Sequence, residues 1–500
     1  MSHLLRNVSL SVTGAVLFAA SPAFAADWSP AATVASGPSG QPADVSALEF
    51  AGDAAGNLTA VWIGSTAGTR GVYSAERPAG GAWGAPAKIV DAPGAERIKL
   101  SLSADGHAVL GWNNRTGNST YVSGIATRTP AGAWTVTEGP NSDAFAELAI
   151  DDAGVATALS TDSGGNLVSK TRNADGTWSA PVIVAPRDLD PADQVIDGSV
   201  DDSDLAVNST GDAVATWTRT IGDSSVVQAT RKPKGGEWTA PQTLATGTPH
   251  EPINFRGTAL SDATVGIDST GQATVAWKEF VAAQPLYTSR VRAVLGGPTG
   301  NWAAVSNVSG DLSADTSTWT QGGAVPETRI PEVTVGAGGE SVVTWGRLDD
   351  GEQAWFAAPR TSGGSWQPPT RLGSWNRGWD PAASAVVDRA GNATVAWVDS
   401  DKVLSRSIAL RPTAPPASAR KVSFSARLMS WNRSCPRTAT AYANGRSARV
   451  PVLPTNSRTT CTVAGGVPVA AGTKLGSRTL VVVSGGGLFP TIVLGRVVAG

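Results

Sequence analysis

Short runs of alternating apolar and small polar residues cover most of the chain, and turns rich in Asp, Asn and Gly separate them. A period of two is typical of β-strands, because successive side chains of a strand point to opposite faces of a sheet. The run from Asn392 to Trp397, directly after Gly391, is one example. An Asp or Asn that opens such a turn and a Gly that closes it favour a hairpin, since Gly adopts positive φ without steric cost. The pattern therefore predicts an all-β chain built from hairpins.

One unit of this pattern recurs seven times. Its mark is a turn glycine followed six positions later by Trp, with Ser in place of Trp in the third copy. The seven pairs are Gly56 and Trp62, Gly106 and Trp112, Gly154 and Ser160, Gly211 and Trp217, Gly271 and Trp277, Gly339 and Trp345, and Gly391 and Trp397. Successive turn glycines are 48 to 68 residues apart, which is enough for four short strands and their turns. Six copies continue through a third strand to a second Trp, at Trp83, Trp134, Trp178, Trp238, Trp302 and Trp366.

The seventh copy lacks the second Trp, and an orphan segment of the same kind stands near the start of the chain. The segment from Trp28 to Val34 (WSPAATV) is similar to the segment from Trp178 to Val184 (WSAPVIV). A ring of four-stranded sheets that closes on itself uses such a displaced strand, and closure removes exposed sheet edges. Residues 26–411 are therefore predicted to form a seven-bladed β-propeller closed by an N-terminal strand. An open solenoid would leave the Trp28 segment unexplained.

The first 25 residues have the pattern of a secretory signal peptide. Arg6 precedes the apolar run Val8–Ala20, and Ala23 and Ala25 occupy the small-residue positions of a cleavage site. We therefore expect residues 1–25 to be removed and the protein to be secreted or associated with the cell envelope.

The C-terminal part differs from the repeats. Residues 412–420 form a Pro/Ala-rich linker, and residues 421–500 contain several short alternating runs that predict a small β-sandwich-like domain. Cys435 and Cys461, the only cysteines, both fall in this domain. In an exported protein such a pair predicts a disulfide.

Composition and charge exclude some classes of binding partner. Lys and Arg number 39 and Asp and Glu 41, giving a formal net charge of −2. This balance excludes a general basic surface for nucleic acid or anionic lipid. After the signal peptide, no run reaches the roughly 18 apolar residues that a membrane-spanning helix needs. With two cysteines and few histidines, neither a metal nor a cofactor is predicted.

The second turn of the repeat, Gly-x-Trp, resembles the Asp-box or BNR repeats of sialidase-like propellers. The nearest match runs from Asn173 through Asp175 and Gly176 to Trp178, and the resemblance covers about 385 residues. Five of the six turns lack the Asp of an Asp box. The resemblance implies a β-propeller. Sialidases also share an arginine triad, a tyrosine nucleophile with its glutamate, and an aspartate acid/base, so a catalytic member would be expected to have them.

The candidate nucleophiles do not match that expectation. Tyr73, Tyr121 and Tyr287 lie 15 to 17 residues after their turn glycines, so they share one third-strand position, whereas a catalytic tyrosine should be unique to one blade. Glu279 could be combined with Arg219 or Arg347 into a site, but the spacing does not single these residues out. We therefore expect these residues to be structural and the protein to be non-catalytic. A divergent sialidase-like glycoside hydrolase remains the alternative.

The connections between the fourth strand of one repeat and the first strand of the next vary most in length, and binding residues often lie on variable loops of a fixed scaffold. Three tryptophans in these loops belong to no repeat position, and an indole offers a flat apolar face for a sugar ring. The predicted ligand-binding residues are these tryptophans and their charged neighbours: Trp319, Trp375, Trp379, Glu327, Arg329, Arg377 and Asp380. A small local core under the long loops is the alternative.

An acidic residue also recurs 9 to 12 positions before each turn glycine. The set is Asp44, Glu96, Asp143, Asp201 or Asp202, Asp262, Glu327 and Asp380. These carboxylates could surround one mouth of a central channel, or they could cap turns at the strand starts.

Together these features predict a secreted, non-enzymatic binding protein that presents a glycan- or protein-binding surface on one face of a β-propeller, in the manner of a lectin. Its expected partner is a glycan or a surface protein. A cell-envelope scaffold acting through the C-terminal domain is a further alternative.

Overall fold

The computed structural model divides the chain into two compact units, residues 1–411 and 412–500. The residues that it describes are 28–36, 47–66, 69–115, 121–130, 132–138, 147–187, 200–221, 224–248, 257–283, 286–315, 327–349, 352–374, 383–399, 402–411, 420–429, 438–443, 446–454, 460–468, 478–485 and 488–499. The expected signal peptide, residues 1–25, lies outside these ranges, as do residues 412–419 of the expected linker.

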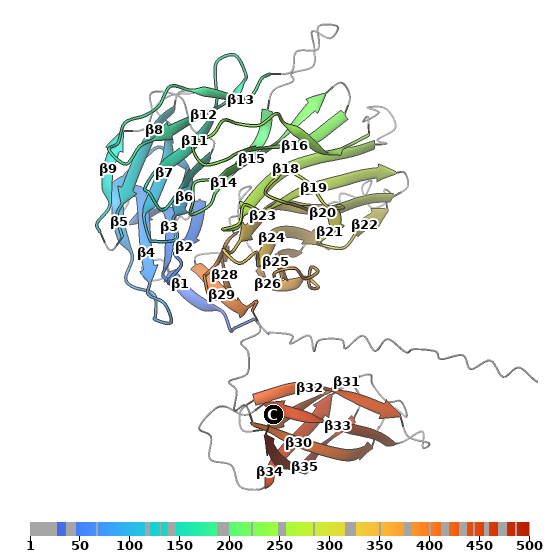
Figure 1. The fold of residues 1–500 in the computed structure, drawn as a ribbon. Helices are drawn as coiled ribbons and strands as arrows, with labels where there is room; N and C mark the ends of the chain where they lie inside the picture. Colours follow the sequence, from blue (N-terminus) through green and yellow to red (C-terminus); the bar gives the residue numbers. More distant parts are fainter. Residues whose placement is uncertain are drawn as a thin grey trace, which may run out of the picture. The chain divides into compact units, whose positions relative to one another are not determined.

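The regular elements of the first unit, within the described ranges, are β-strands in seven antiparallel sheets (Figure 1). The first sheet contains β2 (Ala47–Gly52), β3 (Leu58–Thr66), β4 (Thr69–Arg77) and β5 (Ala87–Asp91). The second contains β6 (Ala95–Leu102), β7 (Ala108–Arg115), β8 (Tyr121–Arg128) and β9 (Thr135–Glu138). The third contains β10 (Glu147–Ile150), β11 (Ala156–Thr161), β12 (Leu167–Arg172) and β13 (Val182–Ala185).

The remaining four sheets follow the same order along the chain. The fourth contains β14 (Val200–Val207), β15 (Ala213–Ile221), β16 (Ser224–Lys232) and β17 (Gln242–Thr246). The fifth contains β18 (Gly257–Ile267), β19 (Ala273–Ala283), β20 (Leu286–Gly296) and β21 (Ser306–Asn307), with β22 (Leu312–Asp315) also paired to β20. The sixth contains β23 (Glu327–Val335), β24 (Ser341–Asp349), β25 (Glu352–Arg360) and β26 (Thr370–Ser374). The seventh contains β27 (Ala383–Val387), β28 (Asn392–Asp399), β29 (Lys402–Ala409) and β1 (Ala32–Ser36).

The turn between the first two strands of each sheet has the geometry that its sequence predicts. All seven turn glycines have positive φ, between 75° and 96°. In the last copy, Oδ1 of Asp388 accepts the backbone N–H of Asn392 at 2.8 Å, and the N–H of Gly391 donates to the carbonyl of Asp388 at 2.9 Å. The Asp side chain and the left-handed glycine therefore close the hairpin together.

The core lies between neighbouring sheets. The Trp six positions after the turn glycine is at most 5% exposed in all six copies that have one. Apolar clusters combine residues of two sheets: Trp62 and Phe50 of the first sheet pack with Val386 and Ala396 of the seventh. Each sheet therefore needs both of its neighbours to bury its apolar faces.

The seven innermost strands form a closed ring. Each of them contacts the next one along the chain, and β27 contacts β2. The seventh sheet uses both ends of the unit, because β1 pairs antiparallel with β29. The Trp28 segment thus supplies the outer strand of the seventh sheet, and the architecture is that of a β-propeller.

The second unit differs from the sandwich-like domain that the sequence suggested. Its strands are β30 (Arg420–Met429), β31 (Thr438–Ala443), β32 (Arg446–Pro454), β33 (Thr460–Pro468), β34 (Arg478–Gly485) and β35 (Leu488–Ala499). They pair in the order β30-β33-β32-β31-β34-β35, and β35 pairs back to β30, so the sheet closes into a barrel. Alternating runs specify strands, but they do not specify whether a sheet closes.

The disulfide of this unit remains a prediction. Cys461 is buried in β33, but Cys435 lies outside the described residues. None of the described segments is a helix long and apolar enough to cross a membrane.

Ring closure through β1 can be tested on one strand. Val34 of β1 is 5% exposed and packs in the cluster between the first and seventh sheets, whereas its neighbour Thr33 is exposed. We expect Val34→Ala to lower the free energy of unfolding by about 2 kcal/mol, and Thr33→Ala to change it by less than about 0.5 kcal/mol. Denaturant unfolding of both variants measures the difference, and equal effects would show that β1 does not contribute to the core.

Candidate functional site

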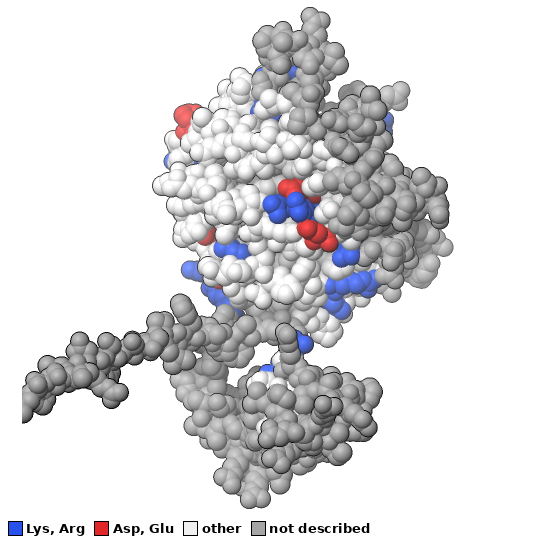
Figure 2. Space-filling model, turned by 90° about the vertical axis from the view of Figure 1, so that its right-hand side faces the viewer, with Lys and Arg blue, Asp and Glu red and all other residues white. Residues whose placement is uncertain are grey.

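A cavity of about 870 Å³ lies at the centre of the first unit. Residues of all seven innermost strands, β2, β6, β10, β14, β18, β23 and β27, line it. Among the described residues on the face drawn in Figure 2, charged side chains of both signs lie scattered.

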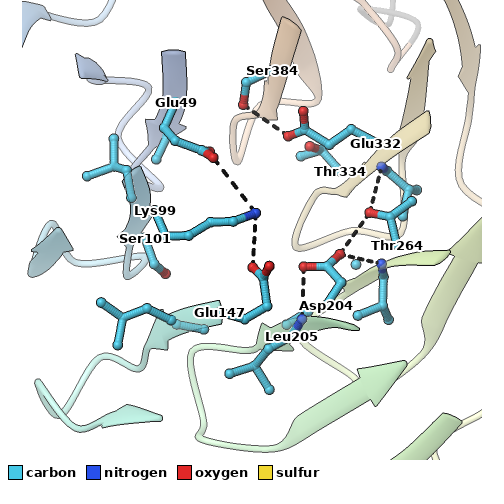
Figure 3. Close-up of a pocket in the computed structure, with 18 of the residues that line it drawn as sticks. Glu49, Lys99, Ser101, Glu147, Asp204, Leu205, Thr264, Glu332, Thr334 and Ser384 are labelled. Atoms are coloured by element: carbon cyan, nitrogen blue, oxygen red, sulfur yellow. Dashed lines mark hydrogen bonds and ion pairs between the residues drawn. The ribbon is translucent and has the colours of Figure 1, made fainter. Parts of the chain in front are cut away.

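One residue of each innermost strand occupies the same place in the repeat and contributes to this cavity (Figure 3). Each of these residues lies seven positions before its turn glycine. We call the set the cavity ring: Glu49, Lys99, Glu147, Asp204, Thr264, Glu332 and Ser384.

Strand periodicity places the ring residues there. Leu48 and Phe50, on either side of Glu49, are each 4% exposed and pack in the apolar cluster with the seventh sheet. Because neighbouring side chains of a strand point in opposite directions, burying the two flanking residues turns Glu49 away from that cluster. The same alternation holds at Lys99, which lies between the buried residues Ile98 and Leu100.

Lys99 joins the first three sheets through its ammonium group. Its Nζ lies 3.0 Å from Oε2 of Glu147 and 3.8 Å from Oε1 of Glu49. One cation thus sits between two carboxylates, and both contacts cross from one sheet to its neighbour (Figure 3).

Hydrogen bonds join the fourth, fifth and sixth sheets. Oδ2 of Asp204 accepts the Thr264 hydroxyl at 2.8 Å and the Val265 N–H at 2.7 Å. The Thr264 oxygen in turn accepts the N–H of Val333 at 3.3 Å.

The remaining two contacts link the sixth, seventh and first sheets. Ser384 lies within hydrogen-bonding distance of Glu332 Oε1 at 3.0 Å and of the Phe50 carbonyl at 3.3 Å. The cavity ring therefore bridges six of the seven junctions between sheets. At the junction between Glu147 and Asp204, neither ring side chain bonds the other sheet, among the part of the chain that the structure describes.

Burial raises the pKa of three ring carboxyls. It raises the pKa of Glu332 to about 8, with the negative charge of Glu49 adding to the effect. Burial likewise raises the pKa of Glu49 to about 7, although Lys99 opposes the shift. The pKa of Glu147 is also raised by burial, and Asp204 adds to the shift. The ring holds four carboxyls and one ammonium, so near neutral pH some of its carboxyls keep a proton and can donate as well as accept hydrogen bonds.

The acidic residues expected near the strand starts take two roles at once. Asp202 and Asp262 line the cavity, and both have positive φ, 44° and 55°, at β-bulges of β14 and β18. Oδ2 of Asp202 accepts the backbone N–H of Asp262 at 3.0 Å, so this carboxylate also caps the next strand. Glu96 lines the cavity as well and pairs with Arg115 at 3.3 Å. Asp44, Asp143 and Asp380 lie outside the described residues.

The loop residues predicted to bind ligand are mostly beyond the described ranges. Trp319, Trp375, Trp379, Arg377 and Asp380 all lie outside them. Glu327 and Arg329 belong to β23, where they pair with Leu348 and Gly346 of β24. The loop platform therefore stays a prediction.

The residues weighed for sialidase-like catalysis lie within sheets and have structural partners. Glu279 of β19 pairs with Arg290 and Arg292 of β20. Tyr287 is 5% exposed and stacks on Phe280 with ring centroids 5.6 Å apart. Tyr73 is 7% exposed and stacks on Trp62. Among the described side chains, no group of three His, Cys, Asp or Glu residues could hold a metal ion.

The residues of the cavity ring were not among those predicted from the sequence, although the signal was present. The count back from each turn glycine gives a polar residue at the seventh position in all seven copies. A search for acidic residues alone cannot detect this position, because Lys99, Thr264 and Ser384 share it. Counting from the strand start fails too, since the bulges in β14, β18 and β23 shift the register.

Comparisons with known proteins give distant structural likenesses. No family model and no curated protein matches the chain. A lectin, BP39L from Burkholderia pseudomallei, is similar with a TM-score of 0.46 and 14% identity, covering 72% of this chain and 95% of the lectin. An alpha-L-arabinanase of Penicillium chrysogenum in complex with arabinobiose has a TM-score of 0.40 and 12% identity, covering 77% and 99%. YCF48 bound to D1 peptide has a TM-score of 0.38 and 11% identity, covering 76% and 94%. Likeness at this level assigns neither a ligand nor an activity.

The raised pKa values make stability depend on pH in a defined direction. A carboxyl with a raised pKa binds its proton more tightly in the folded state, so its stabilising contribution is complete below its unfolded pKa and is lost as pH rises through its folded pKa. For Glu332 this loss extends from about pH 4.5 to about pH 8. We expect the Tm of Glu332→Gln to fall less than that of the parent protein over this window. In a thermal unfolding series, the exposed control Asp91→Asn should keep the parental slope, and a parental slope in Glu332→Gln would contradict the assignment.

Proposed function

We propose that this protein is a seven-bladed β-propeller that binds a hydroxyl-rich ligand, a glycan, in its central cavity without catalysing a reaction. The observation that carries this proposal is the cavity ring, which brings seven polar side chains from seven sheets around one space. A volume of about 870 Å³ lies within the range of small-ligand sites, which is roughly 300–1,000 Å³.

The chemistry of the ring suits hydroxyl groups. Ionised carboxylates accept hydrogen bonds from hydroxyls, while the Lys99 ammonium and any protonated carboxyl donate them. The flanking side chains Leu48, Phe50 and Leu100 are buried between sheets, so the polar side chains of the ring are what a ligand in the cavity would meet.

The predicted loop platform fits the same site through chain connectivity. β23 starts at Glu327, soon after Trp319 in the sequence, and reaches the ring at Glu332. β27 starts at Ala383, directly after the segment that holds Trp375 and Trp379, and reaches the ring at Ser384. We propose that these tryptophans stack on the part of a glycan that extends out of the cavity.

The protein would act outside the cytoplasm. The proposal rests on the signal-peptide pattern of residues 1–25 and on the expected Cys435–Cys461 disulfide. A surface protein as partner and a scaffold role in the cell envelope remain alternatives, and association of the full chain but not of residues 26–411 with cell-wall material would favour the scaffold.

A glycan array tests the binding proposal. We expect the double variant Glu332→Ala/Ser384→Ala to lose at least about tenfold in affinity for the glycans that the parent binds, because it removes a hydrogen-bonded pair from the ring. The matched control is Lys88→Ala/Asp91→Ala, which removes an exposed ion pair from the outer strand β5. Unchanged glycan binding by the ring variant would reject the cavity, and the variant Trp319→Ala/Trp375→Ala/Trp379→Ala would then test the loops separately.

One observation favours a glycoside hydrolase as the second candidate. Glu332, whose pKa is raised to about 8, would keep a proton for a leaving group near neutral pH, and nearby carboxylates could serve as the second group that glycosidases use. We expect no turnover of an aryl-glycoside panel. Turnover that disappears in Glu332→Gln would establish the hydrolase instead.

A further inference from the structure

The cavity ring is incomplete at one place. Going around the ring, a hydrogen bond or ion pair of a ring side chain reaches the next sheet at every junction of the described strands except that between β10 and β14, where Ala149 and Leu205 share an apolar cluster. There Glu147 and Asp204 are successive ring members, and Figure 3 shows both pointing toward the cavity. Two carboxylates thus meet where every other junction has a hydroxyl or an ammonium to bridge it.

Among the described residues, no cation bonds both Glu147 and Asp204, although the charge of Lys99 acts on both. The Lys99 ammonium lies on the other side of Glu147, toward Glu49, and bonds Oε2 of Glu147. Asp204 uses its oxygens for the N–H groups of Leu205 and Val265 and the Thr264 hydroxyl, which are all neutral donors. No salt bridge of Asp204 with Lys or Arg exists within the described part of the chain. The negative charge of Asp204 adds to the effect of burial in raising the pKa of Glu147, so a positive group placed between the two side chains would favour the ionised form of Glu147.

We infer that the ligand of this cavity carries a free amino group that binds between Glu147 and Asp204, so that the preferred glycan is an amino sugar with an unacetylated amine. This inference rests on the proposed glycan-binding function and specifies its substrate class. An ammonium group has three donors, which is enough to bridge two carboxylates and a further acceptor. The hydroxyls of the same sugar would meet the remaining ring members.

A bare metal ion fits the junction less well than an amine. Metal sites in proteins need several oxygen ligands at about 2.0–2.6 Å, and no described group of three acidic, His or Cys residues converges in that way. An amino sugar can instead span a wide cavity, because its pyranose ring holds the amine and the hydroxyls several ångströms apart.

Comparing three monosaccharides distinguishes the contribution of the amine to binding from that of the hydroxyls: glucosamine, N-acetylglucosamine and glucose. Isothermal titration of the full chain near pH 7, in two buffers of different ionisation heat, measures affinity and proton exchange together. We expect glucosamine to bind at least about tenfold more tightly than the other two. Its binding should also release protons, because an ammonium group favours the ionised form of the ring carboxyls.

Two matched Glu-to-Gln variants locate the amine. Glu147→Gln removes the carboxyl group at the open junction, and we expect it to abolish the preference for glucosamine. Glu332→Gln removes a carboxyl group from another junction, so it should weaken binding of the three sugars by similar factors and keep the ratio of their affinities. Asp91→Asn, on the exposed strand β5, controls for the overall charge.

The outcomes distinguish the two proposals. If glucose or N-acetylglucosamine binds as tightly as glucosamine, or if Glu147→Gln keeps the preference, the amine inference is wrong and the glycan-binding function stands. If none of the sugars binds and the glycan array is also negative, the proposed function fails and the inference fails with it. Tight glucosamine binding without proton release would overturn the placement of the amine among the ring carboxyls.

Discussion

Pairing of β1 with β29 is the constraint on which the rest of the structure depends. The apolar clusters lie between sheets, so a sheet at the end of an open row would expose one apolar face to water. β1 completes the seventh sheet, and the cluster that holds Val34 also holds Phe50 of the first sheet and Val403 of the seventh. Once the ring closes, no sheet has a free face, and the direction of every innermost strand is fixed.

Closure has a chemical consequence at the centre. In a flat row of sheets, residues at one repeat position would stand far apart, each with its own solvent. In the closed ring, the same position from seven sheets converges on one cavity, so any ionisable residue there meets its counterparts. This is why burial raises the pKa values of Glu49 and Glu332 with other ring carboxyls adding to each shift, and why Lys99 interacts with two carboxylates at once.

Much of the fold could be predicted from the sequence, because its signals are local. Positive φ at Gly154 or Gly391 follows from the turn itself, and burial of Trp217 or Trp397 follows from the fixed spacing that places it on a central strand. The displaced segment at Trp28 even indicated how the ring closes. The barrel of the second unit was not predictable in this way, since pairing of β30 with β35 joins residues about 75 positions apart and depends on tertiary packing.

The candidate site was harder to predict, because its members share a position but not a residue type. Glu, Lys, Asp, Thr and Ser look unrelated until the closed ring brings them together. The acidic residues nearer the strand starts gave a more uniform signal, yet two of them, Asp202 and Asp262, are explained in part by backbone capping at bulges. The repeated acidic residues near the strand starts therefore indicated local turn structure. The repeated position seven residues before each turn glycine indicated the shared cavity, although the residue type there varies.

Most contacts of the cavity ring have a structural explanation, because they hold neighbouring sheets together. The junction between Glu147 and Asp204 is the part of the site that has no such explanation. Lys99 with its two carboxylates, Thr264 with Asp204, and Ser384 with Glu332 all hold neighbouring sheets together, so they would be useful in a propeller with no function at its centre. Buried ionic groups are nevertheless a costly way to join sheets, since apolar side chains of similar volume often give equal or greater stability. The meeting of Glu147 with Asp204 adds to that cost and joins nothing. A cationic group from outside would offset the repulsion and complete the ring at its one open junction, which is the physical basis for assigning the amine of the ligand to this place.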